Sequence, residues 1–194
     1  MNSLLTQLSP SITKMIRMDH SHVMTVFHRY KPDLAPQTKE ALVNTVSLAL
    51  EIHAQLEEEI FYPALRAATN NDTVLAKSVP EHDEMRRLIG ELRDMSPEDE
   101  AYDETFMSLM REVIHHVADE ETTLLPEAER VLADQLSELG AQMTKRRMEL
   151  AAPRAGEIAT NTVRAMPTTT LLMAAGGMLA GGYLLKRAFG EKRV

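Results

Sequence analysis

Histidine and glutamate recur in this chain at a spacing that could hold metal ions. Residues 53–63 read HAQLEEEIFYP and residues 116–126 read HVADEETTLLP. Each block has a histidine, a glutamate four residues later, a second glutamate next to it, and a proline ten residues after the histidine. One further histidine precedes each block, His20 before the first and His82 before the second. The order His, His-x-x-x-Glu therefore occurs twice.

This internal repeat predicts ligands on facing helices. Residues four apart differ by about 40° around an α-helix, so the histidine and glutamate of each block share one face. If the two halves of the chain pack together, these faces meet on the axis of a bundle, and the single histidines approach from the other helices. Imidazole and carboxylate suit iron, manganese or zinc, and two adjacent cations would offset the cost of burying glutamates that bridge them. We predict a two-metal site with the ligands His20, His53, Glu57, His82, His116 and Glu120.

Breaker residues divide the chain into helices that could position these ligands. Ser9-Pro10 is typical of a helix start, and apolar residues at helical spacing continue to about residue 30. Further helices are expected over residues 37–66, 73–95 with a bend near Pro80, 98–132 with a disturbance at Pro126, and 134–150 with an interruption at Gly140. The pattern predicts an all-α, up-and-down four-helix bundle with an extra C-terminal helix, over residues 1–150.

The composition excludes several classes of protein. The formal net charge of -8 argues against a nucleic-acid partner, because phosphate binding needs clustered Lys and Arg. The absence of cysteine excludes disulfides, thiolate catalysis, iron–sulfur clusters and cysteine zinc sites. The N-terminus has no basic region followed by a long apolar stretch, so we expect no secretory signal and a cytoplasmic protein.

The character of the chain changes after the fifth expected helix. Residues 151–167 are expected to be a polar linker, and residues 168–194 form an apolar, glycine-rich tail with a basic end. Residues 168–185 carry no charge and would span about 27 Å as a helix, near the minimum for a bilayer. The pair Gly177 and Gly181 permits close helix contacts in lipid. We expect attachment to the inner membrane and self-association through the tail; the alternatives are a tail that lies on the membrane surface or docks on the bundle.

The repeated blocks resemble the hemerythrin-like, or HHE cation-binding, family over about residues 10–150. The resemblance implies a four-helix bundle with a non-heme di-iron site, in which the four histidines are terminal ligands and Glu57 and Glu120 bridge. Oxygen-carrying hemerythrins have one more histidine, four residues after the third-helix one, where this chain has Arg86. The six-ligand set is similar to family members linked to nitric-oxide or peroxide stress and iron handling. The iron–sulfur repair branch carries cysteines in an N-terminal extension, and this chain has neither feature.

The sequence also offers other candidates for metal ligands and for the residues that orient them. His115 lies five residues before Glu120, a spacing also found in oxygen-carrying hemerythrins, but the repeat favours His116. A ferritin-like site would use Glu-x-x-His motifs; Glu112 and His115 form one, but Leu50 occupies the matching position in the other half. Asp19 and Glu81 could orient imidazoles, although neighbouring residues point to different sides of a helix.

Three functions are compatible with these features. The leading hypothesis is a di-iron protein that binds or reacts with O2, NO or peroxide at an open coordination position. The alternatives are an iron-binding or iron-supplying protein without turnover, and a membrane-tethered sensor. The sequence does not decide whether the protein is an enzyme.

Overall fold

The structure is a computed structural model that describes residues 6, 8–69 and 74–166. This part of the chain is helical and contains no strand. Its α-helices are α2 (Ile12–Phe27), α3 (Pro36–Leu56), α4 (Tyr62–Ala68), α5 (Leu75–Asp94), α6 (Tyr102–Asp119), α7 (Leu125–Val131), α8 (Leu136–Ala151) and α9 (Ala155–Arg164). Two π-helical turns, η1 (Glu57–Phe61) and η2 (Glu120–Leu124), join α3 to α4 and α6 to α7, and a 3-10 turn, η3 (Ala152–Arg154), joins α8 to α9.

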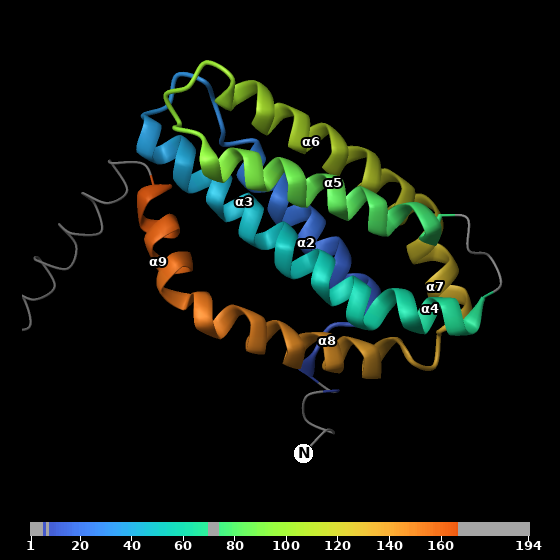
Figure 1. Ribbon diagram of the computed structural model, residues 1–194. Coiled ribbons are helices and arrows are strands. Elements are labelled where there is room, and N and C mark those ends of the chain that lie inside the picture. The colour runs from blue at the N-terminus through green and yellow to red at the C-terminus, as the bar shows by residue number, and fades with distance from the viewer. Residues whose placement is uncertain (1–5, 7, 70–73, 167–194) are drawn as a thin grey trace, which may run out of the picture.

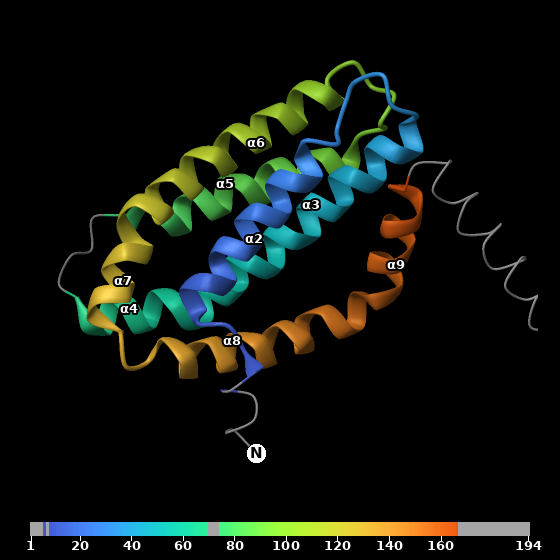
Figure 2. The same cartoon turned by 180° about the vertical axis from the view of Figure 1, so that it is seen from behind.

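Four long helices form an up-and-down bundle, which confirms the predicted fold class. Helix α2 packs on α3, α5 packs on α6, and α3 also contacts α5. Figure 2 shows the same arrangement from behind, with α4 and α7 extending α3 and α6 at one end of the bundle. The two His-x-x-x-Glu blocks thus lie at equivalent places, one at the end of α3 and the other at the end of α6.

The bundle core consists of two apolar clusters, and the ligand candidates lie between them. On α2, Ile12 and Ile16 belong to one cluster, Val23 and Val26 belong to the other, and His20 stands between. On each of the other three long helices the histidine likewise stands between the two clusters along the chain, although after His116 the next cluster residue is Leu124 of η2. The candidate site is therefore a polar layer enclosed by apolar layers, where water screens charge weakly.

Helices α8 and α9 form an arm along one flank of the bundle (Figure 1), in contact with α2 and α3. The segment 151–167, expected to be a linker, is largely helical through η3 and α9. Asn161 of α9 is buried, with 5% of its surface exposed. Arg154 at the joint donates to Glu51 of α3 at 2.7 Å, so polar contacts hold the arm in place.

The expected interruption of the fifth helix at Gly140 is wrong. Helix α8 runs through Gly140 without a break. A Cβ built there would lie 2.1 Å from the carbonyl oxygen of Pro10 and 3.0 Å from the amide nitrogen of Ile12. The glycine is needed because the backbone before α2 passes against α8, not because the helix ends.

Two expected helix starts also differ from the structure. The first helix begins at Ile12, with Ser11 in the capping position, rather than at Ser9-Pro10. The fourth begins at Tyr102, because residues 96–101 form turns in which the Asp99 carboxylate accepts from the Ser96 amide. Helix α5 continues through Pro80.

The predicted tail lies outside the described residues, so its membrane attachment stays a prediction. Within residues 6, 8–69 and 74–166, no helix combines the length and the apolar character that crossing a bilayer requires.

Candidate metal centre

The six predicted ligands meet inside the bundle. All are buried, with exposed fractions between 0% for Glu57 and Glu120 and 4% for His20 and His53. His20 is on α2, His82 is on α5, and each block supplies its histidine from a long helix and its glutamate from the first residue of a π-helical turn. The sequence repeat has thus become a structural repeat around one centre.

The ligand atoms form two groups that share Glu57. One group is His20, His53, Glu57 and Glu120, and the other is Glu57, His82 and His116, with all ligand atoms of a group within 4.8 Å of one another. Within the blocks, Nε2 of His53 lies 3.3 Å from Glu57, and Nε2 of His116 lies 3.5 Å from Glu120. The single histidines cross over to the glutamate of the other half.

These crossing contacts tie the two halves together. Nε2 of His20 lies 3.3 Å from Oε2 of Glu120, and Nε2 of His82 lies 3.4 Å from Oε2 of Glu57. Each glutamate is therefore close to imidazoles from both halves of the chain, as a bridging ligand would be.

The π-helical turns place the two glutamates where the long helices widen. Each turn is followed within two residues by a proline, Pro63 or Pro126, near the start of the next α-helix, where a missing N–H is tolerated. The expected disturbance at Pro126 is thus a widened turn, and the chain stays helical. Such turns often occur at functional sites. The repeated proline was the signal in the sequence, but it did not identify the kind of turn.

Each histidine has a carboxylate behind it, at Nδ1. Nδ1 of His20 pairs with Glu121 at 2.8 Å, and Nδ1 of His82 pairs with Glu58 at 2.8 Å. Each histidine of a block pairs with the acid that directly precedes the single histidine of its own half. Asp19 lies 3.4 Å from His53, and Glu81 lies 2.9 Å from His116. A carboxylate at Nδ1 fixes the ring and directs the lone pair of Nε2 toward the centre, as is usual for metal-binding histidines.

Two of these outer carboxylates are also held by arginine. Arg86 donates to Glu58, and both terminal nitrogens of Arg147 on α8 donate to Asp19. Arg86 occupies the position at which the resemblance would place a seventh ligand in oxygen carriers, but its side chain supports the carboxylate behind His82.

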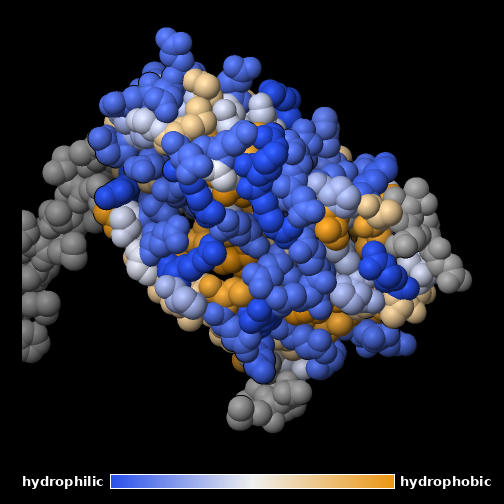
Figure 3. Space-filling model, viewed as in Figure 1, coloured by the Kyte–Doolittle hydropathy of each residue, from blue (hydrophilic) through white to orange (hydrophobic). Residues whose placement is uncertain are grey.

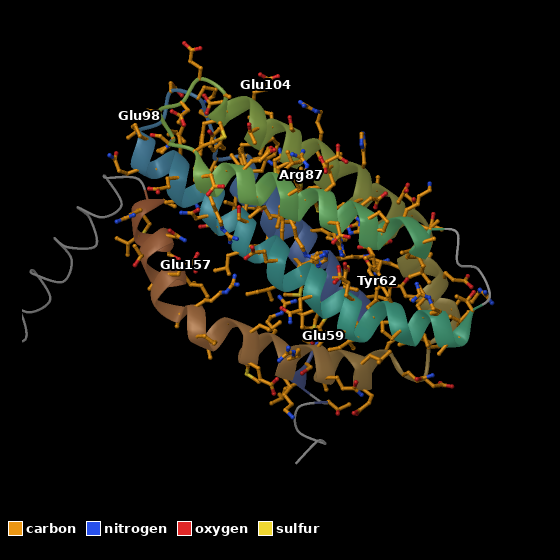
Figure 4. All side chains as sticks on the ribbon, viewed as in Figure 1. Glu59, Tyr62, Arg87, Glu98, Glu104 and Glu157 are labelled. Carbon is orange, nitrogen blue, oxygen red and sulfur yellow. The ribbon has the colours of Figure 1, made fainter. Side chains whose placement is uncertain are left out.

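Tyr62 is a site residue that the sequence analysis missed. Its hydroxyl lies 3.0 Å from Oε2 of Glu57 and 2.9 Å from Oε1 of Glu120, at the start of α4 (Figure 4). Burial, and then the charges of the two glutamates, raise the pKa of Tyr62 well above its usual value, so the phenol stays protonated and can donate. The matching position in the second block is Leu125, so the site is not symmetric here.

The electrostatics show what these side chains do without a metal. Burial alone would raise the pKa of Glu57, but the charge of His53 and hydrogen bonds from His116 and His82 hold that pKa well below its usual range. Burial lowers the pKa of His116, but hydrogen bonds to Glu57 and Glu81 outweigh it and raise the pKa to about 10. A proton on His116 therefore balances the charge of the buried Glu57.

Buried atoms facing the centre fit a metal cation. Among the described residues, Nε2 of His20, Nε2 of His53, Oε1 of Glu57 and Oε2 of Glu120 have no hydrogen-bond partner. Leaving such groups unmatched is costly, and imidazole nitrogens with carboxylate oxygens are suitable donors for iron, manganese or zinc. The alternative ligand His115 is exposed, and so are His22 and His28; the ferritin-like pair Glu112 and His115 does not join the cluster.

The sequence profile of the hemerythrin HHE cation binding domain matches residues 11–158. This chain belongs to the hemerythrin HHE cation-binding domain family. The match continues past the four-helix bundle through α8 and into α9, so the family domain includes most of the arm. Buried His and Glu clusters in a member of a cation-binding family support a metal-binding site.

Two relatives place this family member among known proteins. A crystal structure of a hemerythrin HHE cation binding domain-containing protein from Mycobacterium kansasii superposes with a TM-score of 0.66, at 21% identity, over 81% of this chain and 99% of the other. A DNA nickase from Nostoc sp. (strain PCC 7120 / SAG 25.82 / UTEX 2576) is 28% identical over 128 residues, 66% of this chain. The chain spans 36% of the length of that nickase.

Proposed function

We propose that this family member binds two iron ions with its six buried ligands and that the centre binds or reacts with O2, NO or peroxide. The observation that carries the proposal is the convergence of four Nε2 atoms on two shared carboxylates, with four of these ligand residues presenting an atom that lacks a protein partner. Manganese or zinc would fit the same donors, so iron is the finer part of the proposal.

Iron held here would supply an open coordination position and electrons for a small oxidant. The protein's part is to hold the ligands and exclude water. The two apolar clusters close the layer above and below, and the outer carboxylates prevent the imidazoles from turning. The Tyr62 hydroxyl can donate its one hydrogen bond to the carboxylate of Glu57 or to that of Glu120.

Metal analysis with spectroscopy tests the proposal. Protein purified without oxygen in the presence of iron should contain about two irons per chain, and exposure to O2 should then produce oxo-bridged absorption bands. Replacing both glutamates, Glu57→Ala with Glu120→Ala, should abolish loading. The matched control is Glu112→Ala on α6, outside the cluster. Full loading of the double variant would sink the two-metal proposal.

The reactions of the loaded protein separate the remaining functions. Consumption of peroxide or NO selects an enzyme, whereas reversible O2 binding selects carriage or sensing. Fast loss of iron to a chelator selects iron supply. We do not extend the activity of the DNA nickase to this chain, because a net charge of -8 disfavours binding to a phosphate backbone; conversion of supercoiled plasmid to the nicked form by the loaded protein would overturn this.

A further inference from the structure

A cavity of about 210 Å³ lies between α3 and the α8–α9 arm. Its wall reaches Asp19 and His53 at the edge of the metal centre. In Figure 3, apolar side chains are visible in a hollow of an otherwise hydrophilic face, between α3 and the arm. Of the six ligands, His53 alone is among the residues that line the cavity, and the proposed function does not use the cavity.

The greater part of the lining is apolar. Leu48, Ala49 and Ile52 of α3 form one wall, and Ile158 of α9 faces them. An apolar cavity of about 150 Å³ is large enough to bind benzene, so this one can hold a ring-sized organic molecule.

Asn161 and Arg147, which both line the cavity, each carry an unmatched donor. Asn161 is 5% exposed, and its Nδ2 finds no acceptor among the described residues. The Nε of Arg147 is likewise without a partner there, because the two terminal nitrogens of that side chain are bound to Asp19. A buried donor without an acceptor is costly, so these two N–H groups favour an occupant that carries an oxygen acceptor.

The hydroxyls near the cavity have carbonyl partners of their own. Those of Thr45 and Thr162 donate to carbonyls of their own helices at 2.7 Å, so they do not need a ligand. The charge of Arg147 is offset by Asp19, and the donors can therefore receive a neutral carbonyl as well as a carboxylate.

We propose that this cavity is a second ligand site, which binds a small molecule with a ring-sized apolar body and one carbonyl or carboxylate oxygen directed at Asn161 and Arg147. Its occupant contacts the acid that holds Nδ1 of His53, so the site adjoins one metal ligand. The proposal does not depend on which metal the centre binds.

Three probe compounds test the proposal with the full-length, metal-loaded protein. Benzamide and benzoate carry the neutral and the anionic acceptor, and toluene has the apolar body alone. Saturation-transfer NMR and calorimetry should show benzamide or benzoate binding with a Kd of about millimolar or tighter, and toluene binding at least several-fold more weakly. Absence of binding by all three, or toluene binding as tightly as the better of the other two, would overturn the proposal.

Two variants locate the binding. Asn161→Leu keeps the volume but removes the donor, and should weaken the better acceptor probe by about tenfold while leaving toluene unchanged. Ala49→Phe fills the cavity and should abolish binding of all probes. Asn44→Leu on α3, outside the lining, is the control. Undiminished binding to Ala49→Phe would overturn the proposal. Unchanged circular dichroism and iron content in each variant show that a loss of binding is due to the cavity and not to misfolding or failure of the metal centre.

Discussion

Arg86 donates to Glu58 at 2.6 Å, and the same carboxylate oxygen lies 2.8 Å from Nδ1 of His82. Arg86, at the position where oxygen carriers have a further histidine, therefore acts on the ligand His82 through the Glu58 carboxylate. Burial would raise the pKa of Glu58, but His82 and Arg86 hold it below its usual value, so the acid stays ionised behind the imidazole.

Removing this arginine should weaken the metal centre. In Arg86→Leu, Glu58 loses its cation and no longer fixes His82 as firmly, and we expect metal affinity to fall by about 10–100-fold. Competition with a chelator measures it. Arg87→Leu is the matched control, because the adjacent Arg87 pairs only with Glu84 and Glu91 among the described residues, on the exposed side of α5 (Figure 4). Equal affinity in the two variants would contradict the role given to Arg86.

Replacing Tyr62 should destabilise the metal-free protein. Tyr62→Phe removes a buried O–H that donates to Glu57 or to Glu120, and a hydrogen bond to a charged group contributes roughly 1.5 to 3 kcal/mol. Urea unfolding of the metal-free protein measures the loss. Tyr102→Phe provides the comparison, since Tyr102 is also buried but contacts neither glutamate. Similar losses in both variants would show that the hydroxyl has no special role at the centre.

The raised pKa of His116 predicts how stability depends on pH in the metal-free protein. A group with a pKa of about 10 in the folded state and 6.5 in the unfolded state stabilises the fold fully below about pH 6.5. That contribution decreases between pH 6.5 and 10. Melting temperatures of chelator-treated protein should therefore fall over this range, and His116→Gln should flatten the slope whereas His115→Gln, at an exposed neighbour, should not. A melting temperature that rises with pH above 7 would refute the assignment.

The close approach at Gly140 predicts opposite effects at two glycines. Gly140→Ala places a Cβ 2.1 Å from the carbonyl oxygen of Pro10, which must move, and should cost about 1–3 kcal/mol. A Cβ at Gly156 meets nothing within 4 Å, so Gly156→Ala in α9 should be neutral or stabilise by up to about 1 kcal/mol. Thermal unfolding of both variants tests this, and a neutral Gly140→Ala would show that α8 is held less closely than described.

The predicted membrane attachment of the tail is best tested with a truncated chain that keeps both helices of the arm, α8 and α9. A chain ending at residue 152 would also lose α9, which packs on α3, so the informative truncation is 1–166. If residues 168–185 anchor the protein, the full chain should sediment with membranes and the 1–166 chain should remain in the supernatant. Full-length protein in the supernatant would refute anchoring.

Spacing within a helix was predictable because it depends only on helical geometry. His53 and Glu57 share a face in any helix, and the repeat in the sequence was enough to pair the two blocks. The outer carboxylates were not predictable in the same way. Asp19 does point away from its neighbour His20, but its partner, His53, is on another helix, and the contact depends on how the helices pack.

The features that the sequence did not predict depend on contacts between helices. Tyr62 reads as an ordinary aromatic residue within a block, and only the position of both glutamates shows that its hydroxyl faces them. Residues 151–167 suggested a linker because the segment is polar. Contact with α3 overrides this local preference, and the burial of Asn161 follows from that contact.

The π-helical turns make chain length in the two blocks as important as residue type. Each turn contains one residue more than an α-helical path would need. Deleting a single residue between Glu57 and Tyr62 would let the helix close to ordinary α geometry, so Tyr62 and Leu65 could keep their places in the core. The widened turn that presents Glu57 would be lost, although every ligand was still encoded. Single-residue deletions in residues 57–61 and 120–124 should therefore impair metal binding more than they impair folding.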